Sequence, residues 1–146
     1  MSTKVKKLYE DAIIPTKGSA SAAGWDLYAH LPSNTTMEIK PHETVKIGTG
    51  VAVSLPDHTF GAIAARSGLA TKQGLAPANK LGIVDEDYRG EIIVALHNHS
   101  NETRYVENED RIAQLIIIPY IPVNLEIVDE LEQTNRGDGG FGSSGE

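Results

Sequence analysis

Three neighbouring carboxylates and a tyrosine in residues 82–91 (GIVDEDYRGE) are of the types that hydrolytic chemistry requires. Asp85, Glu86 and Asp87 lie in a turn between two apolar runs, and Tyr88 follows them. A carboxylate can hold a water molecule and accept its proton, while an aromatic ring beside an exposed hairpin backbone can contact the edge of a nucleobase. The alternative is an acidic hairpin tip that is merely solvated, since such turns are common.

A further carboxylate, Asp26, lies two residues after Gly24 in the apolar segment 23–29 (AGWDLYA). An apolar strand seldom tolerates an unpaired charge, because taking the charge out of water is unfavourable unless a partner compensates for it. Asp26 is therefore a second candidate for a functional carboxylate.

The last residues change composition abruptly, since five of the fourteen glycines lie in residues 136–145 (RGDGGFGSSG). Composition alone indicates a flexible glycine-serine tail. Arg136 and Phe141 instead favour a segment that orders over an anion and a stacked ring, because glycine-rich backbone can approach a ligand closely. Residues 137–142 match G-x-G-x-x-G, but that fingerprint works only between a strand and a helix, so we do not expect a Rossmann site.

Composition excludes several classes of protein. The 146 residues include no cysteine, which excludes disulfides, thiolate metal sites and a cysteine nucleophile. The net charge of −7 opposes binding to a phosphate backbone, so we expect no nucleic acid as a partner. Neither a P-loop nor the G-x-S-x-G elbow of serine hydrolases occurs. His97 and His99 share one face of a predicted strand, where cross-strand polar neighbours are a better interpretation than half of a metal site.

The apolar segments give no sign of export or of a membrane role. Residues 1–10 contain lysines but lead into acidic residues instead of an apolar run, so we expect no secretory signal. The longest apolar stretch, residues 112–121, contains Gln114 and Pro119 and is too short to span a bilayer. We therefore expect a cytoplasmic or nuclear protein that is not secreted and has no membrane partner.

The elements that must position these residues are mostly short strands. Apolar, β-branched segments bounded by turn residues occupy residues 43–55, 59–65 and 91–98. From Val45 to Val53 the odd positions are β-branched and the even positions are polar or small, which predicts a strand with one buried face.

Two further segments complete the predicted architecture. Residues 67–73 (SGLATKQ) predict one short helix of about two turns, capped by Ser67. Residues 115–128 are apolar at more than alternate positions, and either a partner subunit or burial of a strand on both faces would explain this. The whole pattern predicts an all-β domain over residues 1–135, a jelly-roll-like sandwich or barrel, followed by a flexible glycine-rich arm at 136–146.

Five segments, in order and across nearly the whole chain, resemble the five motifs of the homotrimeric dUTPases. They are AGWDLYA at 23–29, ARSGLA at 65–70, GIVDEDYRGEI at 82–92, DRIAQLI at 110–116 and RGDGGFGSSG at 136–145. Each motif alone is modest, but their joint order and spacing are highly specific. The chain departs from the usual family pattern without losing a catalytic group, at Trp25, Ala65, Glu109, Asp138 and Ser144.

The resemblance implies hydrolysis of dUTP to dUMP and pyrophosphate, which limits uracil incorporation into DNA and supplies dUMP for dTMP synthesis. Members of the family share three active sites among the subunits of a jelly-roll trimer, so we expect a homotrimer. Asp85 would hold the water that attacks the α-phosphorus. The family uses a divalent ion, usually Mg²⁺, and Asp26 would contact this ion from its outer shell through water.

The same resemblance implies contacts with each part of the nucleotide. The polyphosphate would be bound by Arg66, Ser67, Gly68 and Gln114, with Arg111 either contributing or supporting the structure. Uracil would be recognised by Asn79 and by backbone from Gly82 through Val84 to Tyr88. The Tyr88 ring would pack under the deoxyribose and leave no room for a 2′-hydroxyl.

The glycine-rich arm of one subunit would close over the nucleotide held by another and exclude bulk water. Phe141 would stack on uracil and Arg136 would meet the γ-phosphate. Gly142, Ser143 and Ser144 would supply backbone and hydroxyl donors to the phosphates.

Two other functions compete with dUTP hydrolysis. A dCTP deaminase has the same fold, but it uses a glutamate at the position of Ala95, where this chain offers no proton shuttle. A noncatalytic nucleotide sensor would keep the pocket without turnover, and the intact set of chemical groups argues against it. Ammonia release from dCTP and pyrophosphate release from dUTP distinguish these functions.

Overall fold

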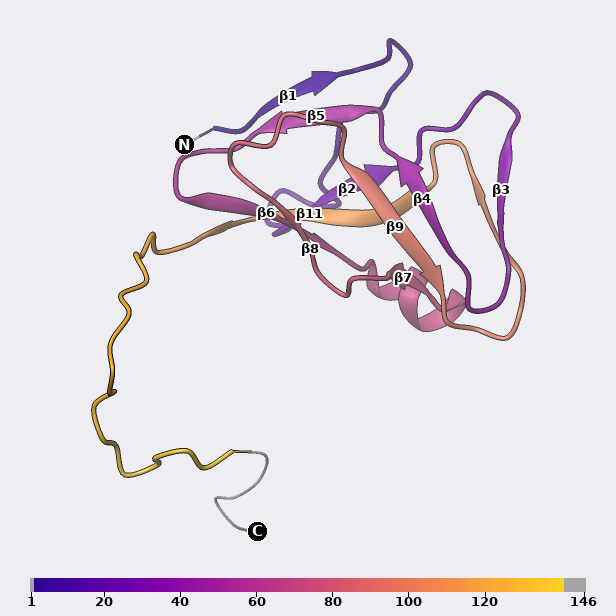
Figure 1. Ribbon diagram of the computed structural model, residues 1–146. Coiled ribbons are helices and arrows are strands. Elements are labelled where there is room, and N and C mark those ends of the chain that lie inside the picture. Colours follow the sequence, from indigo (N-terminus) through magenta and orange to yellow (C-terminus); the bar gives the residue numbers. More distant parts are fainter. Residues whose placement is uncertain (1, 141–146) are drawn as a thin grey trace.

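The chain folds almost entirely into short antiparallel strands, as described by a computed structural model for residues 2–140 (Figure 1). In this range one short helical segment, η1, accompanies the strands. The elements are β1 (Lys4–Lys7), β2 (Trp25–Tyr28), β3 (Thr36–Ile39), β4 (Thr44–Gly48), β5 (Val51–Ser54), β6 (Thr59–Ala64), η1 (Leu69–Gln73), β7 (Leu75–Pro77), β8 (Gly82–Val84), β9 (Ile93–Asn98), β10 (Arg104–Glu107) and β11 (Arg111–Pro119).

Two larger sheets and two ribbons make up the body. The larger sheets have the orders β2-β11-β6-β8 and β4-β9-β7, and the ribbons pair β1 with β5 and β3 with β10. Strands far apart in the sequence lie side by side, since Trp25 pairs with Leu115 and Leu115 also pairs with Ile63. This confirms the predicted all-β, jelly-roll-like class, with sheets that do not close into a barrel in the described part of the chain.

The core is one cluster of aliphatic side chains that draws on both larger sheets. Leu27 and Ile112 come from the four-stranded sheet, Ile47 and Leu96 from the three-stranded sheet, and all four are at most 1% exposed. Burial of each such side chain stabilises the fold by about 1.5–3 kcal/mol. The sheets therefore form a fixed frame that carries the loops of the site.

Residues 43–55 do not form the single strand that the alternation predicted. Gly50, with φ +69°, separates β4 from β5, and a Cβ at this glycine would lie 2.6 Å from Cβ of Ala12. Ala52 and Val53 are both buried, so β5 is covered on both faces, and β1 pairs along its edge. The prediction of one buried face was therefore wrong for β5, where Ala52 is only 6% exposed.

The predicted helix is present, but it is shorter than expected and Ser67 does not cap it. Gly68 occupies the N-cap position, where the structure gives no side-chain capping bond. The carbonyl oxygen of Ser67 instead accepts a hydrogen bond from the Thr71 hydroxyl at 2.7 Å. The helix ends at Gly74, whose φ of +70° places it in the left-handed region that favours glycine.

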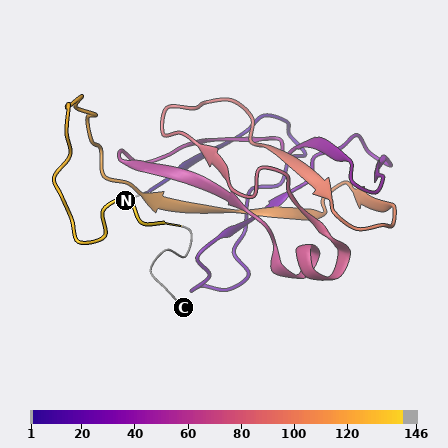
Figure 2. The same ribbon diagram turned by 60° about the horizontal axis from the view of Figure 1, so that its bottom comes forward.

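After β11 the chain leaves the sheets and runs away from the body through residues 120–140 (Figures 1 and 2). Ile121, Leu125 and Ile127 are 83%, 97% and 99% exposed. Burial on both faces within one chain is therefore wrong for this part of residues 115–128, and the partner-subunit interpretation stays a prediction. Across residues 2–140, the structure has no helix long and apolar enough to cross a membrane.

Candidate functional site

A pocket of about 210 Å³ lies between β8 and β9 and gathers the predicted base-binding residues. Asp85 lines the pocket together with predicted residues from the preceding loop, β8 and the following turn. The lining residues are Ile63, Pro77, Asn79, Gly82, Ile83, Val84, Asp85, Tyr88, Glu91, Ile92, Ile93, Val94 and Ala95. Five positions chosen from the sequence thus meet in one place.

Strand β8 offers free backbone groups to this pocket. It is the terminal strand of the four-stranded sheet and pairs only with β6 within that sheet. A terminal strand presents unpaired N–H and C=O groups along its outer edge, and these can pair with the edge of a planar ligand. A Cβ at Gly82 would lie 3.3 Å from Nδ2 of Asn79, so the Asn79 amide lies close to this backbone.

The turn after β8 holds Tyr88 folded back across the chain. The Asp85 carbonyl accepts the Tyr88 N–H at 3.1 Å, and the Tyr88 hydroxyl donates to the Glu91 carbonyl at 3.0 Å. A Cβ at Gly90 would overlap the Tyr88 hydroxyl. Glycine at position 90 therefore allows the ring to occupy this place beside the pocket.

A second group of charged side chains surrounds Asp26. Asp26 Oδ1 lies 2.9 Å from Nε of Arg66, and its Oδ2 lies 3.3 Å from Nη1 of Arg111. The Asp26 side chain is only 16% exposed, so its predicted need for a partner is met by two guanidinium groups. Two positive charges against one negative charge leave the group net positive and suited to an anion.

Gln114 lies on β11 between the strands that carry this charged group. In the strand registers it is opposite both Asp26 and Ala64, and its Nε2 donates to the Ala65 carbonyl at 2.8 Å. A Cβ at Gly24 would lie 2.7 Å from Gln114 Oε1. The Gln114 side chain thus holds the end of β6 just before Arg66.

Asp85 and the charged group lie toward opposite ends of β6. Val84 pairs with Gly61 near the start of β6, whereas Ala64 at its end pairs with Gln114, and Arg66 follows two residues later. At about 3.3 Å per residue, Asp85 and Arg66 are roughly 20 Å apart along the strand direction. A single chain therefore does not bring Asp85 and Arg66 around the same phosphate chain.

Residues of the glycine-rich arm are described only as far as position 140. Arg136 is exposed on the extended segment, and its Nε donates to the Gly139 carbonyl at 2.9 Å. Phe141, Gly142, Ser143 and Ser144 lie outside the described residues.

His97 on β9 takes part in a cross-strand polar contact, and His99 follows the end of that strand. Nδ1 of His97 lies 2.9 Å from the hydroxyl of Thr44, its partner on β4, and the His97 and His99 rings are stacked. Residues 2–140 contain no group of three or more His, Cys, Asp or Glu side chains that could hold a metal ion.

Sequence reasoning missed Glu91, which lines the pocket and anchors the end of its hairpin. The Glu91 Oε1 accepts the backbone N–H of Gly50 at 2.8 Å and so ties the hairpin to the turn between β4 and β5. Strand pairing brings residues 50 and 91 together, and no local pattern in the sequence reveals that pairing.

The pocket beside the edge strand suits a planar ring, and the net positive group around Asp26 suits an anion. A nucleotide carries both a ring and an anion, so these features are typical of nucleotide-binding enzymes. A family model described as dUTPase matches residues 10–145. The chain belongs to the dUTPase family.

Named relatives cover nearly the whole chain. The deoxyuridine 5'-triphosphate nucleotidohydrolase of Desulfitobacterium hafniense is 47% identical over 90% of this chain and 87% of its own length. The protein of the same name from Nautilia profundicola is 46% identical over 99% of both chains. The dUTPase of Staphylococcus bacteriophage 80alpha, solved with dUpNHpp, superposes with a TM-score of 0.87 at 28% identity and covers 99% of this chain and 98% of that chain.

Proposed function

We infer that this protein is an enzyme that hydrolyses dUTP to dUMP and pyrophosphate. The observation that carries this conclusion is the dUTPase match over residues 10–145, within which the pocket joins Asp85 and Tyr88 to a free strand edge. Relatives at 46% and 47% identity bear the name deoxyuridine 5'-triphosphate nucleotidohydrolase. The reaction limits uracil incorporation into DNA and supplies dUMP for dTMP synthesis.

Asp85 is the general base of the proposed mechanism. Its exposed carboxylate lies at the end of β8 on the wall of the pocket, where it can hold a water molecule and take its proton as the water attacks the α-phosphorus. The P–O bond to the β-phosphate breaks as the new bond to water forms, so dUMP and pyrophosphate leave.

Backbone and ring contacts select the nucleoside. The free edge of β8 and the Asn79 amide would offer donors and acceptors to uracil. The Tyr88 ring, which lines the pocket, would take the space that a 2′-hydroxyl needs. Ala95 lines the same pocket with a methyl group that cannot transfer a proton. Phosphate hydrolysis is therefore favoured over deamination of cytosine.

The separation along β6 favours a site that is shared between copies of this chain. Arg66 lies roughly 20 Å from Asp85 of the same chain along the strand direction, and Ser67 and Gly68 follow Arg66 in the sequence. In a homotrimer each site would combine the pocket of one subunit with the phosphate-binding residues of another. The net positive group around Asp26 would then meet the triphosphate.

The exposed segment 121–127 is the proposed contact between subunits. Its apolar side chains alternate with polar ones and have no cover in the single chain. An apolar groove of about 530 Å³ is lined by Val5, Ile14, Trp25, Leu115 and Ile117, among others, and could receive this segment from a second copy. Burial of these side chains would remove a large unfavourable contact with water.

The family depends on a metal ion, and we propose Mg²⁺ as the ion used here. Mg²⁺ prefers phosphate oxygens and retained waters to a cage of protein ligands. Both Asp26 oxygens are hydrogen-bonded to arginines but keep further lone pairs for water, which fits the outer-shell contact that we expected. When bound, the ion neutralises charge on the phosphates, while Asp26 orients its waters and the arginines.

The C-terminal arm closes the proposed site. Arg136, Phe141, Gly142, Ser143 and Ser144 would bind the γ-phosphate, the uracil ring and the remaining phosphate oxygens. The length of exposed chain from Pro119 to Arg136 supports delivery of the arm to a neighbouring subunit. Closure would exclude bulk water and strengthen each charge interaction with the phosphates.

Asp85→Asn is the variant that tests the mechanism. The amide keeps the size of the side chain but cannot accept the proton, so we expect the kcat for pyrophosphate release to fall at least about a hundredfold, with dUTP binding retained. The assay compares dUTP, dCTP, dTTP and UTP, each with and without Mg²⁺. Binding of dUTP without turnover by the unaltered protein would favour a sensor, and full turnover by the variant would refute the role of Asp85.

A further inference from the structure

Glu86, the neighbour of the proposed base, is the side chain that fastens the catalytic turn to the rest of the molecule. Its Oε2 accepts the backbone N–H of His58 at 2.5 Å, from the loop that enters β6. Glu86 is half-buried, whereas Asp85 and Asp87 on either side are exposed. Three adjacent carboxylates repel one another, so a fixed position for the middle one limits where the others can move.

The loop that holds Glu86 is itself well anchored. The Thr59 hydroxyl donates to the Pro56 carbonyl at 2.7 Å, and the Tyr120 N–H donates to the His58 carbonyl at 2.9 Å. His58 has a φ of +58°, a left-handed conformation that a residue other than glycine adopts only when its surroundings hold it there. The anchored loop therefore presents its N–H group in a defined direction.

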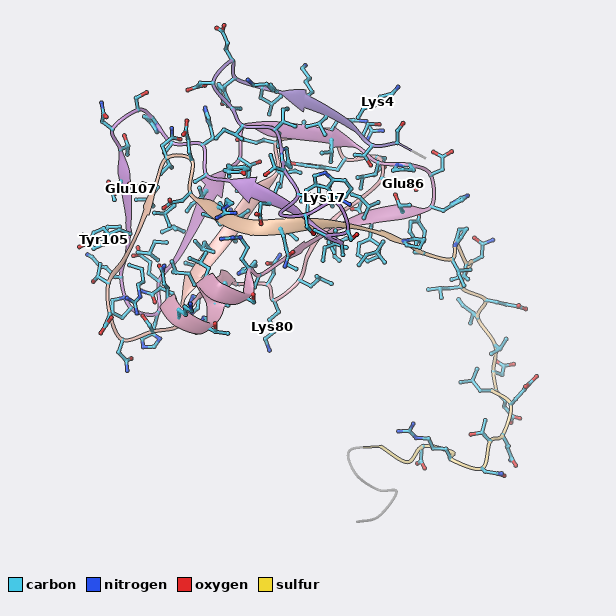
Figure 3. All side chains as sticks on the ribbon, turned by 180° about the vertical axis from the view of Figure 1, so that it is seen from behind. Lys4, Lys17, Lys80, Glu86, Tyr105 and Glu107 are labelled. Atoms are coloured by element: carbon cyan, nitrogen blue, oxygen red, sulfur yellow. The ribbon has the colours of Figure 1, made fainter. Side chains whose placement is uncertain are left out.

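Tyr120 completes the surroundings of Glu86, at the point where the chain leaves β11. A second hollow is lined by Phe60, Glu86, Asp87 and Tyr120, among others. Loss of contact with water, followed by the charge of Glu86, raises the pKa of Tyr120. Figure 3 shows Glu86 on the side of the molecule from which residues 120–140 depart.

We propose that Glu86 is a positioning residue for the hydrolysis of dUTP: through the His58 N–H it fixes the turn and so sets the place of the Asp85 carboxylate. This rests on the proposed role of Asp85 as the base. Displacement of a reacting group by about 1 Å can cost a hundredfold in rate. In this proposal Glu86 contacts His58 and acts on Asp85 as its neighbour in the chain.

The test compares Glu86→Ala with Glu86→Gln in the full-length protein. Alanine removes the acceptor, and we expect kcat for dUTP to fall about tenfold to a hundredfold while KM changes less than about twofold. Glutamine keeps an oxygen that can accept the His58 N–H, and we expect it to restore most of kcat. Amide hydrogen exchange at His58 should be faster in the alanine variant and slow again in the glutamine variant.

Three controls distinguish positioning of the turn from a general loss of charge, stability or assembly. Asp57→Ala removes a charge beside His58 without removing a bond to the turn, and it should leave kcat unchanged. The melting temperature and the oligomeric mass of Glu86→Ala should match those of the unaltered protein. Wild-type kcat in Glu86→Ala, or equal impairment in Glu86→Gln, would overturn the proposal. If Asp85→Asn keeps its turnover, the assignment of the base fails instead.

Discussion

At the scale of single residues, two glycines make room for side chains of the proposed site. Gly90 and Gly24 each stand where a Cβ would meet a proposed substrate-binding side chain, Tyr88 in one case and Gln114 in the other. Neither glycine would contact the nucleotide in the proposed mechanism. Both act by leaving room for the residue that would.

Gly90→Ala should weaken discrimination against UTP. The added methyl group overlaps the Tyr88 hydroxyl, so the ring must leave its place and open space for a 2′-hydroxyl. We expect the ratio of kcat/KM for dUTP to that for UTP to fall about tenfold. In a Tyr88→Ala background the Gly90→Ala change should add little, and an undiminished effect there would show that Gly90 acts by another route.

At single positions the sequence marked residues that the structure places together. Asn79, Gly82, Val84, Asp85 and Tyr88 line one pocket, and their roles toward a nucleotide stay predictions. The partners of Asp26 were not predictable, because Arg66 and Arg111 reach it only through the pairing of β2, β11 and β6. The same limit applies to Glu91, whose bond to Gly50 spans 41 residues.

At the scale of elements, the turn before β11 contains one of the departures from the usual family pattern. Glu109, where the family commonly has glycine, has a φ of +71°. Its N–H donates to the Ala29 carbonyl at 2.9 Å, so the turn is held in place by β2 and its extension. A side chain in the left-handed region costs about 1–2 kcal/mol relative to the right-handed region.

Glu109→Gly should therefore stabilise the protein. Glycine removes the free-energy cost of the left-handed conformation, and this gain exceeds the free-energy cost of ordering a more flexible glycine on folding. We expect the free energy of unfolding to rise by about 0.5–1 kcal/mol. Denaturant unfolding measures the change. Glu109→Gln removes the charge but keeps the strain and should have little effect, so equal stabilisation by glutamine would assign the gain to charge.

Strand positions were partly predictable for a physical reason. A period of two identifies a strand whose faces differ, as in β9, where buried and less buried residues alternate from Ile93 to Asn98. It fails for β5, because Ala52 and Val53, which point to opposite faces, are both buried. The predicted cap at Ser67 was also wrong, because η1 begins one residue later than expected and Gly68 occupies the N-cap position.

At the scale of the whole molecule, the described chain presents an incomplete surface. Val123, Leu125 and Ile127 are 74%, 97% and 99% exposed and occupy alternate positions of the segment. A stable soluble protein does not leave such a row uncovered. We propose that further copies of the chain cover these side chains. The same association would complete the active site.

Leu125→Ser combined with Ile127→Ser should break the assembly. Without these side chains the segment loses most of its apolar area, so we expect the mass in sedimentation equilibrium to fall from a trimer toward a monomer. Turnover of dUTP should fall with it, because Asp85 and Arg66 of one chain lie at different ends of β6. Asn124→Ser removes no apolar side chain from the segment and should leave both mass and turnover unchanged.

A trimer that persists in the Leu125→Ser, Ile127→Ser variant would place the subunit contact elsewhere. Full turnover by a monomeric form would contradict the shared site itself. The two measurements together therefore test assembly and catalysis separately.

The unpaired outer edge of β8 also bears on evolution and inhibition. Every residue except proline carries a backbone N–H, and every residue carries a C=O. The Ile83 side chain, which is 55% exposed, can therefore change without altering the backbone groups along that edge. A compound that pairs with the same amide and carbonyl groups would meet few single-codon routes to resistance in this strand. Escape would require a change of backbone path, which the pairing with β6 opposes.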